Sequence, residues 1–68
     1  MPHIVISQAS RLSPEKKEAV LSKVTAAYAE ATGTDPAKVS VVLQEVDRSD
    51  WAVAGQSLAS RDAAARGD

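Results

Sequence analysis

Residues 39–46 of this chain read Val39-Ser40-Val41-Val42-Leu43-Gln44-Glu45-Val46, a density of β-branched and apolar residues that is typical of a β-strand. Successive side chains of a strand point to opposite faces. Val39, Val41 and Leu43 would therefore lie on one face. Val42 and Val46 would lie on the other. A strand that is apolar on both faces is normally covered on both faces, so this segment predicts packing partners on either side.

A helix is predicted before this strand. Ser13 suits the N-cap position, Pro14 suits the first helical position because it has no N–H to leave unpaired, and Glu15 places negative charge at the positive end of the helix dipole. Gly33 is expected to end the helix in the left-handed conformation. Apolar residues recur between these points at helical spacing and predict one buried stripe, made of Val20, Leu21, Val24, Ala27, Tyr28 and Ala31.

A first, shorter strand is predicted from His3 to Ser7, around the β-branched run Ile4-Val5-Ile6. Strand, helix and strand in this order predict a βαβ unit with two parallel strands and a helical crossover. The fold class is therefore α/β (α+β). Two parallel strands and one helix are too few to be stable alone, and the helix can cover only one face of the sheet. The other face and the free edge are expected to meet further copies of the chain.

The C-terminal part predicts a polar turn, Asp47 to Asp50, and then a short apolar stretch from Trp51 to Gly55, together forming a short hairpin or tail. Residues 56–68 are expected to hold one helical turn around Leu58 and then to fray. The whole chain, residues 1–68, is expected to form one domain, with residues 62–68 as the frayed tail.

Composition excludes several classes of function. The chain has 68 residues, no Cys, one His and a net charge of −1. Such a charge disfavours nucleic acid as a partner, because phosphate binding needs a basic face. The single His and scattered carboxylates do not predict a metal site. No apolar run approaches the roughly 20 residues that span a bilayer, and no signal peptide is recognised before Pro2, so a cytoplasmic protein without a membrane partner is expected.

Pro2 follows the initiator methionine directly. Methionine aminopeptidase removes Met1 when the next residue is small, and proline qualifies. The mature chain would then begin with a free secondary amine, which can accept a proton near neutral pH, whereas an internal proline nitrogen cannot. The predicted strand begins immediately behind Pro2 and would hold this amine on a rigid element.

Taken together, these features resemble the 4-oxalocrotonate tautomerase family, over nearly the whole chain to about Arg61. The resemblance rests on Met1-Pro2, the strand from His3 to Ser7, Ser13-Pro14-Glu15-Lys16-Lys17 and the following helix, the segment from Val39 to Glu45, and Asp50-Trp51-Ala52-Val53-Ala54-Gly55. It implies a cofactor-independent isomerase that interconverts the enol and keto forms of a small 2-oxo acid. It also implies a homo-oligomer, usually a hexamer built as a trimer of dimers, with the amino-terminal proline as general base and no metal.

The resemblance also suggests which residues bind the substrate. Trp51 aligns with an aromatic residue of the family's pocket, and an apolar pocket or a nearby arginine would lower the pKa of the proline amine into a useful range. Two arginines of typical members are replaced here by Leu12 and Ser40. Arg11, one position earlier, is the expected substitute, although Arg48 or Arg61 from a neighbouring subunit is an alternative. A monocarboxylate substrate is therefore expected, because an unpaired carboxylate is costly to bury.

Two other functions remain open from the sequence. One is a hydratase or dehalogenase of the same superfamily, in which a protonated Pro2 acts as an acid on an unsaturated or halogenated substrate. The other is a non-catalytic assembly module, in which Pro2 is only the first residue of a strand. The paired arginines that would favour the hydratase or dehalogenase are not found in this sequence.

Overall fold

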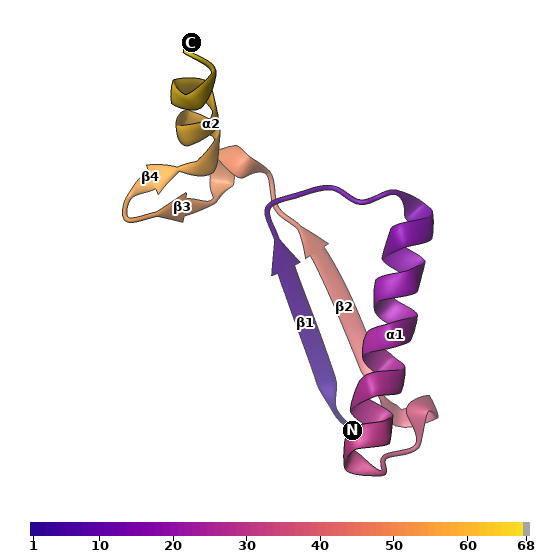
Figure 1. Ribbon diagram of the computed structural model, residues 1–68. Helices are drawn as coiled ribbons and strands as arrows, with labels where there is room; N and C mark the ends of the chain where they lie inside the picture. The colour runs from indigo at the N-terminus through magenta and orange to yellow at the C-terminus, as the bar shows by residue number, and fades with distance from the viewer. Residues whose placement is uncertain (68) are drawn as a thin grey trace.

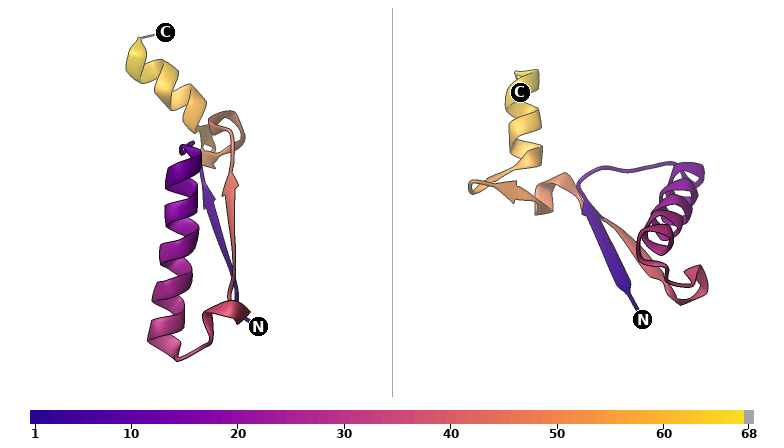
Figure 2. Two further views of the ribbon diagram at one scale, coloured as in Figure 1. Left: turned by 90° about the vertical axis from the view of Figure 1, so that its right-hand side faces the viewer. Right: turned by 60° about the horizontal axis from the view of Figure 1, so that its bottom comes forward.

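Strand β1 (His3–Gln8), helix α1 (Pro14–Thr32) and strand β2 (Ser40–Glu45) form the main body of the computed structural model, which describes residues 1–67. β1 and β2 pair in parallel, in a register that runs from His3 opposite Ser40 to Gln8 opposite Glu45. Helix α1 lies along one face of this two-stranded sheet (Figures 1 and 2). The predicted α/β class and the βαβ order are confirmed.

Local signals determine both ends of α1 as the sequence predicts. The Ser13 hydroxyl accepts a hydrogen bond from the Lys16 N–H at 3.3 Å, and Pro14 occupies the first helical position. Gly33 ends the helix with a φ of 73°, a left-handed conformation that glycine adopts at little cost, and its N–H donates to the Ala29 carbonyl at 2.9 Å. A short 3-10 turn, η1 (Pro36–Lys38), then leads the chain into β2.

The rest of the chain, residues 48–67, forms a C-terminal unit beyond the carboxyl ends of the two strands (Figure 1). It contains the 3-10 turn η2 (Arg48–Asp50), the hairpin strands β3 (Ala52–Val53) and β4 (Gln56–Ser57), and helix α2 (Leu58–Arg66). The hairpin loop is Ala54-Gly55, with φ values of 56° and 82°. Two consecutive positive φ values match a type I′ turn, whose twist suits a two-residue hairpin.

The sequence predicts a single helical turn around Leu58 and a frayed tail from residue 62, and the structure corrects this. Helix α2 continues to Arg66, while Asp68 lies outside the described residues. The Ser57 hydroxyl caps the helix by accepting from the Ser60 N–H at 3.1 Å, and Gly67 ends it with a φ of 78°. Consecutive alanines, the best helix formers, fill the last turns between these caps.

The single chain is extended and has little core of its own. Its dimensions are 49 × 25 × 15 Å and its radius of gyration is 15.9 Å, against about 11 Å for a compact domain of this length. Ala29 is the only buried apolar residue among residues 1–67. On the sheet face opposite α1, Val5 and Val42 form a cross-strand pair and are 49% and 37% exposed. This face therefore lacks the cover that the sequence predicts for it.

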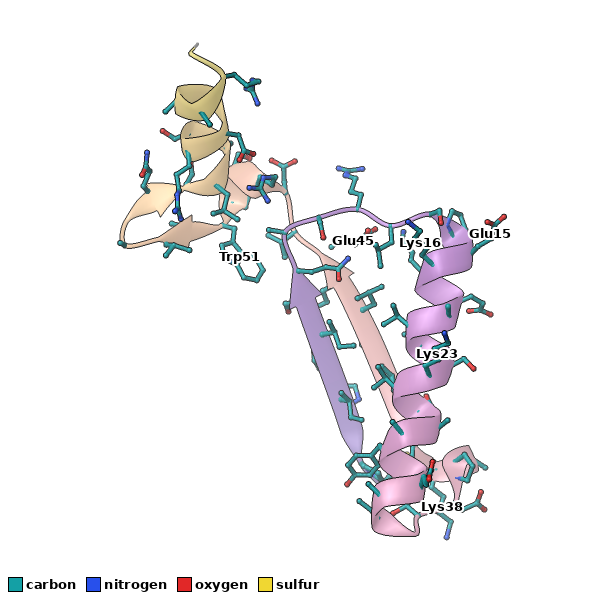
Figure 3. The ribbon with its side chains drawn as sticks, in the orientation of Figure 1. Glu15, Lys16, Lys23, Lys38, Glu45 and Trp51 are labelled. Atoms are coloured by element: carbon teal, nitrogen blue, oxygen red, sulfur yellow. The ribbon has the colours of Figure 1, made fainter. Side chains whose placement is uncertain are left out.

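Glu45 joins the end of β2 to the loop between β1 and α1. Its Oε2 accepts a hydrogen bond from the Leu12 N–H at 2.7 Å, and its Oε1 lies 2.7 Å from Lys17 Nζ on α1 (Figure 3). The Lys17 hydrogen bond and then the Leu12 N–H hold the pKa of the Glu45 carboxyl below its ordinary value of 4.5. The loop that carries Arg11 and Leu12 is thus tied to the sheet by one carboxylate.

Replacing this carboxylate should change the acid stability of the fold. Because the pKa of Glu45 is lower in the folded than in the unfolded chain, its contribution to stability is full above pH 4.5 and is lost as the pH falls through the folded value. Glu45→Gln should therefore lower the urea midpoint at pH 7 and reduce the further drop below pH 4.5. Glu30→Gln, on the exposed side of α1, is the control. Identical pH profiles for the two variants would contradict the role given to Glu45.

Candidate active site

Pro2 stands immediately before β1 and is held by the other strand. Its carbonyl accepts a hydrogen bond from the Ser40 N–H at 3.0 Å, which continues the parallel ladder to the last residue before the strand. With Met1 attached, the Pro2 nitrogen is an amide. Met1 is 94% exposed, so the bond that an aminopeptidase would cut is open to solvent in the single chain. Removing Met1 would leave a secondary amine on a fixed backbone.

Ser40 is the one predicted substrate-binding residue that the fold brings next to Pro2. It opens β2 and lies directly across the ladder from His3. The Ser40 hydroxyl and His3 Nδ1 are 3.3 Å apart, on the sheet face that α1 does not cover. Both strands therefore begin with a polar residue beside the position of the amine.

Arg11, Leu12 and Trp51 lie at the opposite end of the sheet. Arg11 and Leu12 belong to the loop that follows β1, and Trp51 follows η2 in the C-terminal unit (Figure 3). The six residues of β1, at about 3.3 Å each, separate these residues from Pro2 by about 20 Å. Within one chain they do not meet the amine.

Arg11 is exposed and Leu12 is half-buried. Arg11 lines a shallow hollow between the β1–α1 loop and the C-terminal unit, together with Ala9, Ser10, Val46, Asp47, Arg48 and Ala59. A hydrogen bond from Ser49 and the more distant positive charge of Arg11 lower the pKa of Asp47 in this hollow. Leu12 lines a separate apolar depression with Val20 and Val24 of α1.

Arg48 connects the C-terminal unit to the β1–α1 loop. Its Nη2 donates to Asp62 Oδ1 at 2.8 Å and its Nε to Asp62 Oδ2 at 2.5 Å, while Nη1 donates to the Ala9 carbonyl at 3.0 Å. The pairing raises the pKa of Arg48 and lowers that of Asp62. All three guanidinium nitrogens of Arg48 thus have protein partners, which leaves Arg11 better placed than Arg48 to bind an anion.

Trp51 is half-buried at the junction between η2 and β3. Its carbonyl accepts the Leu58 N–H at 2.8 Å, so the start of α2 anchors its backbone. Since Arg48 ties α2 to the Ala9 carbonyl, Trp51 and Arg11 belong to one connected group of segments. The structure brings these two residues to the same end of the molecule, as a pocket built from both requires.

Three features of the site were missed from the sequence. Glu45 and the Arg48–Asp62 pair depend on tertiary contacts, and no local pattern indicates them. His3 could have been found, because it follows Pro2 and the parallel register places it opposite Ser40. Among residues 1–67, no group of three His, Cys, Asp or Glu side chains is arranged to hold a metal ion. No helix in this part of the chain is long and apolar enough to cross a membrane.

Comparison with known proteins gives a consistent result. The family model of the tautomerase enzyme matches residues 2–61. The 2-hydroxymuconate tautomerase of Comamonas testosteroni is 40% identical over 57 residues, which are 84% of this chain and 90% of that protein.

Two solved structures extend this similarity to the fold. TomN, a 4-oxalocrotonate tautomerase homologue in the tomaymycin biosynthetic pathway, is 34% identical with a TM-score of 0.86, over 91% of this chain and 95% of that one. A heterohexamer 4-oxalocrotonate tautomerase from Chloroflexus aurantiacus is 32% identical with a TM-score of 0.80, over 87% and 95% of the two chains. The chain belongs to the 4-oxalocrotonate tautomerase family of the tautomerase superfamily and is an isomerase.

Proposed function

We propose that the protein interconverts the enol and keto forms of a small 2-oxo acid, with Pro2 as the general base after Met1 is removed. The observation that carries this proposal is the placement of Pro2. It stands directly before β1, its carbonyl is held by the Ser40 N–H of β2, and the match to the tautomerase family begins at this residue. A base fixed on a strand can be aligned with one substrate proton, which a base on a mobile tail cannot.

The reaction needs one group that both takes and gives a proton. The neutral amine of Pro2 removes the proton of the hydroxyl group on C2 of the enol, and the electrons of that O–H bond form the C2 carbonyl. The electrons of the carbon–carbon double bond then take a proton at C3 from the Pro2 ammonium, which returns to the amine. Atoms and charge balance without a cofactor, and a base whose pKa lies near the working pH serves both steps.

Pro2→Ala tests the base. The variant keeps an amine, but a primary one of different basicity and shape, so kcat/KM for phenylenolpyruvate should fall roughly 10- to 100-fold while the fold survives. A chain that retains Met1 should lose activity altogether, because an amide nitrogen cannot accept the proton. Mass spectrometry establishes which form of the chain is assayed. Equal rates for wild type and Pro2→Ala would refute Pro2 as the base.

We further propose that the working site is formed between subunits of a homo-oligomer, a hexamer arranged as a trimer of dimers. The distance of about 20 Å along β1 supports this, since Arg11 and Trp51 can approach a Pro2 only from another copy. The uncovered pair Val5 and Val42 supports it as well, because burying two valines exposed at the centre of a sheet face is favourable. The similarity to a heterohexamer tautomerase gives independent support.

The assembly can be tested at its uncovered sheet face. Val42→Asp places a charge on this face and should shift the protein to smaller species in light scattering at micromolar concentration, with loss of activity. Val42→Thr keeps the shape of the side chain and should remain assembled. A wild-type protein that is a stable, folded monomer would disprove the subunit arrangement.

The preferred substrate is proposed to carry one carboxylate, with an apolar remainder against Leu12 and Trp51. Leu12 and Ser40 bring no charge, and the guanidinium of Arg48 is committed to Asp62 and Ala9. Arg11 of a neighbouring copy is then the anchor for a single carboxylate, which it can bind through two parallel hydrogen bonds. A second carboxylate would be left without a cation.

Arg11→Ala should raise KM for a monoacid enol roughly tenfold, since a hydrogen bond to a charged group is worth about 1.5–3 kcal/mol. Arg48→Ala is the comparison, and it should affect KM less because it acts only through the position of the loop and the hairpin. The decisive measurement is kcat/KM for a monoacid enol against its diacid analogue in each variant. A diacid preference that persists in Arg11→Ala would show that another arginine binds the substrate.

A further inference from the structure

The two ends of the β1–β2 sheet differ in the basic residues that they carry. The four arginines lie in the β1–α1 loop, η2 and α2, all at the end where the strands finish (Figure 1). At the end where the strands begin, beside Pro2, the basic side chains of the described chain are His3 and Lys38, the latter at the end of η1 (Figure 3). Within one chain, the end of the sheet that carries Pro2 therefore has an imidazole and an ammonium but no arginine.

His3 is the better placed of the two. It is adjacent to Pro2 in sequence, and its backbone is held by the same ladder that holds Pro2, in register with Ser40. Its Nδ1 lies 3.3 Å from the Ser40 hydroxyl oxygen, and in the single chain its ring is exposed on the face away from α1. Ser40 is the only hydrogen-bond partner of this ring among residues 1–67, so Nε2 is not engaged by its own chain.

The contact with Ser40 engages Nδ1 and leaves Nε2 as the ring nitrogen without a partner in its own chain. When the hydroxyl donates to Nδ1, the neutral imidazole carries its hydrogen on Nε2, the atom that points away from Ser40. The Nε2–H group is then a hydrogen-bond donor for which its own chain provides no acceptor. Ser40 thus acts as the orienting partner of a histidine, in the way that second groups orient histidines in other sites.

We propose that His3 donates a hydrogen bond from Nε2 to the oxygen on C2 of the substrate, and that Ser40 positions the His3 ring. The inference rests on the proposed function and deepens it. As Pro2 removes the hydroxyl proton, negative charge develops on this oxygen, and it disappears when C3 is protonated. A donor already aimed at that oxygen stabilises the transition state more than the bound enol. Its effect should therefore appear in kcat.

This role differs from that of Arg11. Arg11 of a neighbouring copy binds the carboxylate, whose charge is the same in the enol and in the transition state, so its loss appears mainly in KM. His3 contacts the oxygen whose charge changes, so its loss appears mainly in kcat. His3 and Arg11 lie at opposite ends of the sheet in one chain. In the oligomer, His3 of one copy and Arg11 of another would reach the same substrate.

The chain contains a matched control for the His3–Ser40 pair. At the other end of the same strands and on the same sheet face, the Ser7 hydroxyl donates to Gln44 Oε1 at 3.0 Å, again across the parallel ladder. Ser7→Ala and Gln44→Ala remove the same kind of cross-strand contact, about 13 Å away from His3 and Ser40 along the strand. Variants of this second pair report what loss of a cross-strand hydrogen bond alone does.

The experiment measures kcat and KM for phenylenolpyruvate with the processed protein. His3→Ala should lower kcat at least about tenfold with KM changed no more than about threefold, and His3→Gln, which keeps an N–H at similar reach, should recover part of the loss. Ser40→Ala should lower kcat less than His3→Ala, and Ser40→Thr should restore it. Ser7→Ala, Gln44→Ala and Lys38→Ala should match wild type.

A second measurement does not depend on turnover. His3 is the only histidine, so its imidazole nitrogen signals can be followed by NMR without ambiguity. Saturating phenylpyruvate should shift the Nε2 signal in wild type and in Ser7→Ala. Ring signals that stay unchanged, or a kcat for His3→Ala equal to that of wild type, would overturn the proposal.

The Pro2→Ala variant distinguishes failure of the proline base from failure of the His3 donor. If Pro2→Ala loses activity while His3→Ala keeps it, the proline base stands and the role of His3 is refuted. If His3→Ala loses kcat while Pro2→Ala keeps activity, His3 remains the donor and the base is a different group. A loss of kcat in Lys38→Ala with none in His3→Ala would transfer the donor role to Lys38.

Discussion

The parallel pairing of β1 with β2 is the constraint on which the rest of the structure depends. Six residue pairs, from His3 opposite Ser40 to Gln8 opposite Glu45, determine what each end of the sheet can present. At the beginning of the strands this register places Pro2 and His3 beside Ser40. At the other end it places Glu45 in hydrogen-bond contact with the loop that carries Leu12, and the C-terminal unit follows β2 in the chain. A shift of the register by one residue would move the side chains of one strand to the opposite faces of the sheet and would separate these groups.

The two ends of the sheet have different chemistry because of this arrangement. The starting end has a potential amine, an imidazole and a hydroxyl, which are groups that exchange or donate protons. The finishing end has charged pairs, Glu45 with Lys17 and Arg48 with Asp62, which hold segments in place. These pairs are partly exposed to solvent, so they contribute modestly to stability and mainly orient the loop and the hairpin. An enzyme assembled from such chains would combine proton transfer from one end with substrate anchoring from the other.

The sequence predicts the parts of the fold that local interactions determine. Ser13, Pro14 and Gly33 act within a turn of their positions, so both ends of α1 could be predicted to the residue. The buried stripe could be predicted only in part, because Ala27 and Ala31 are exposed while Ala29 is buried. Periodicity gives the face of a helix, but the packing partner decides how wide that face is. The Arg48–Asp62 pair joins residues 14 apart, and no local pattern encodes it. The length of α2 follows from local signals that the sequence contains, the cap at Ser57 and the stop at Gly67.

The register has a further consequence for the order in which the chain folds. Strand β1 leaves the ribosome before its partner strand, which begins 37 residues after His3, at Ser40. Closing a loop of that length costs about 3 kcal/mol of chain entropy before the first sheet contact forms. Helix α1 needs only local contacts and forms in about a microsecond or less, so it shortens the distance that the strands must then bridge. Until β2 is complete, the first strand of a nascent chain remains an unpaired edge, accessible to the first strands of other chains.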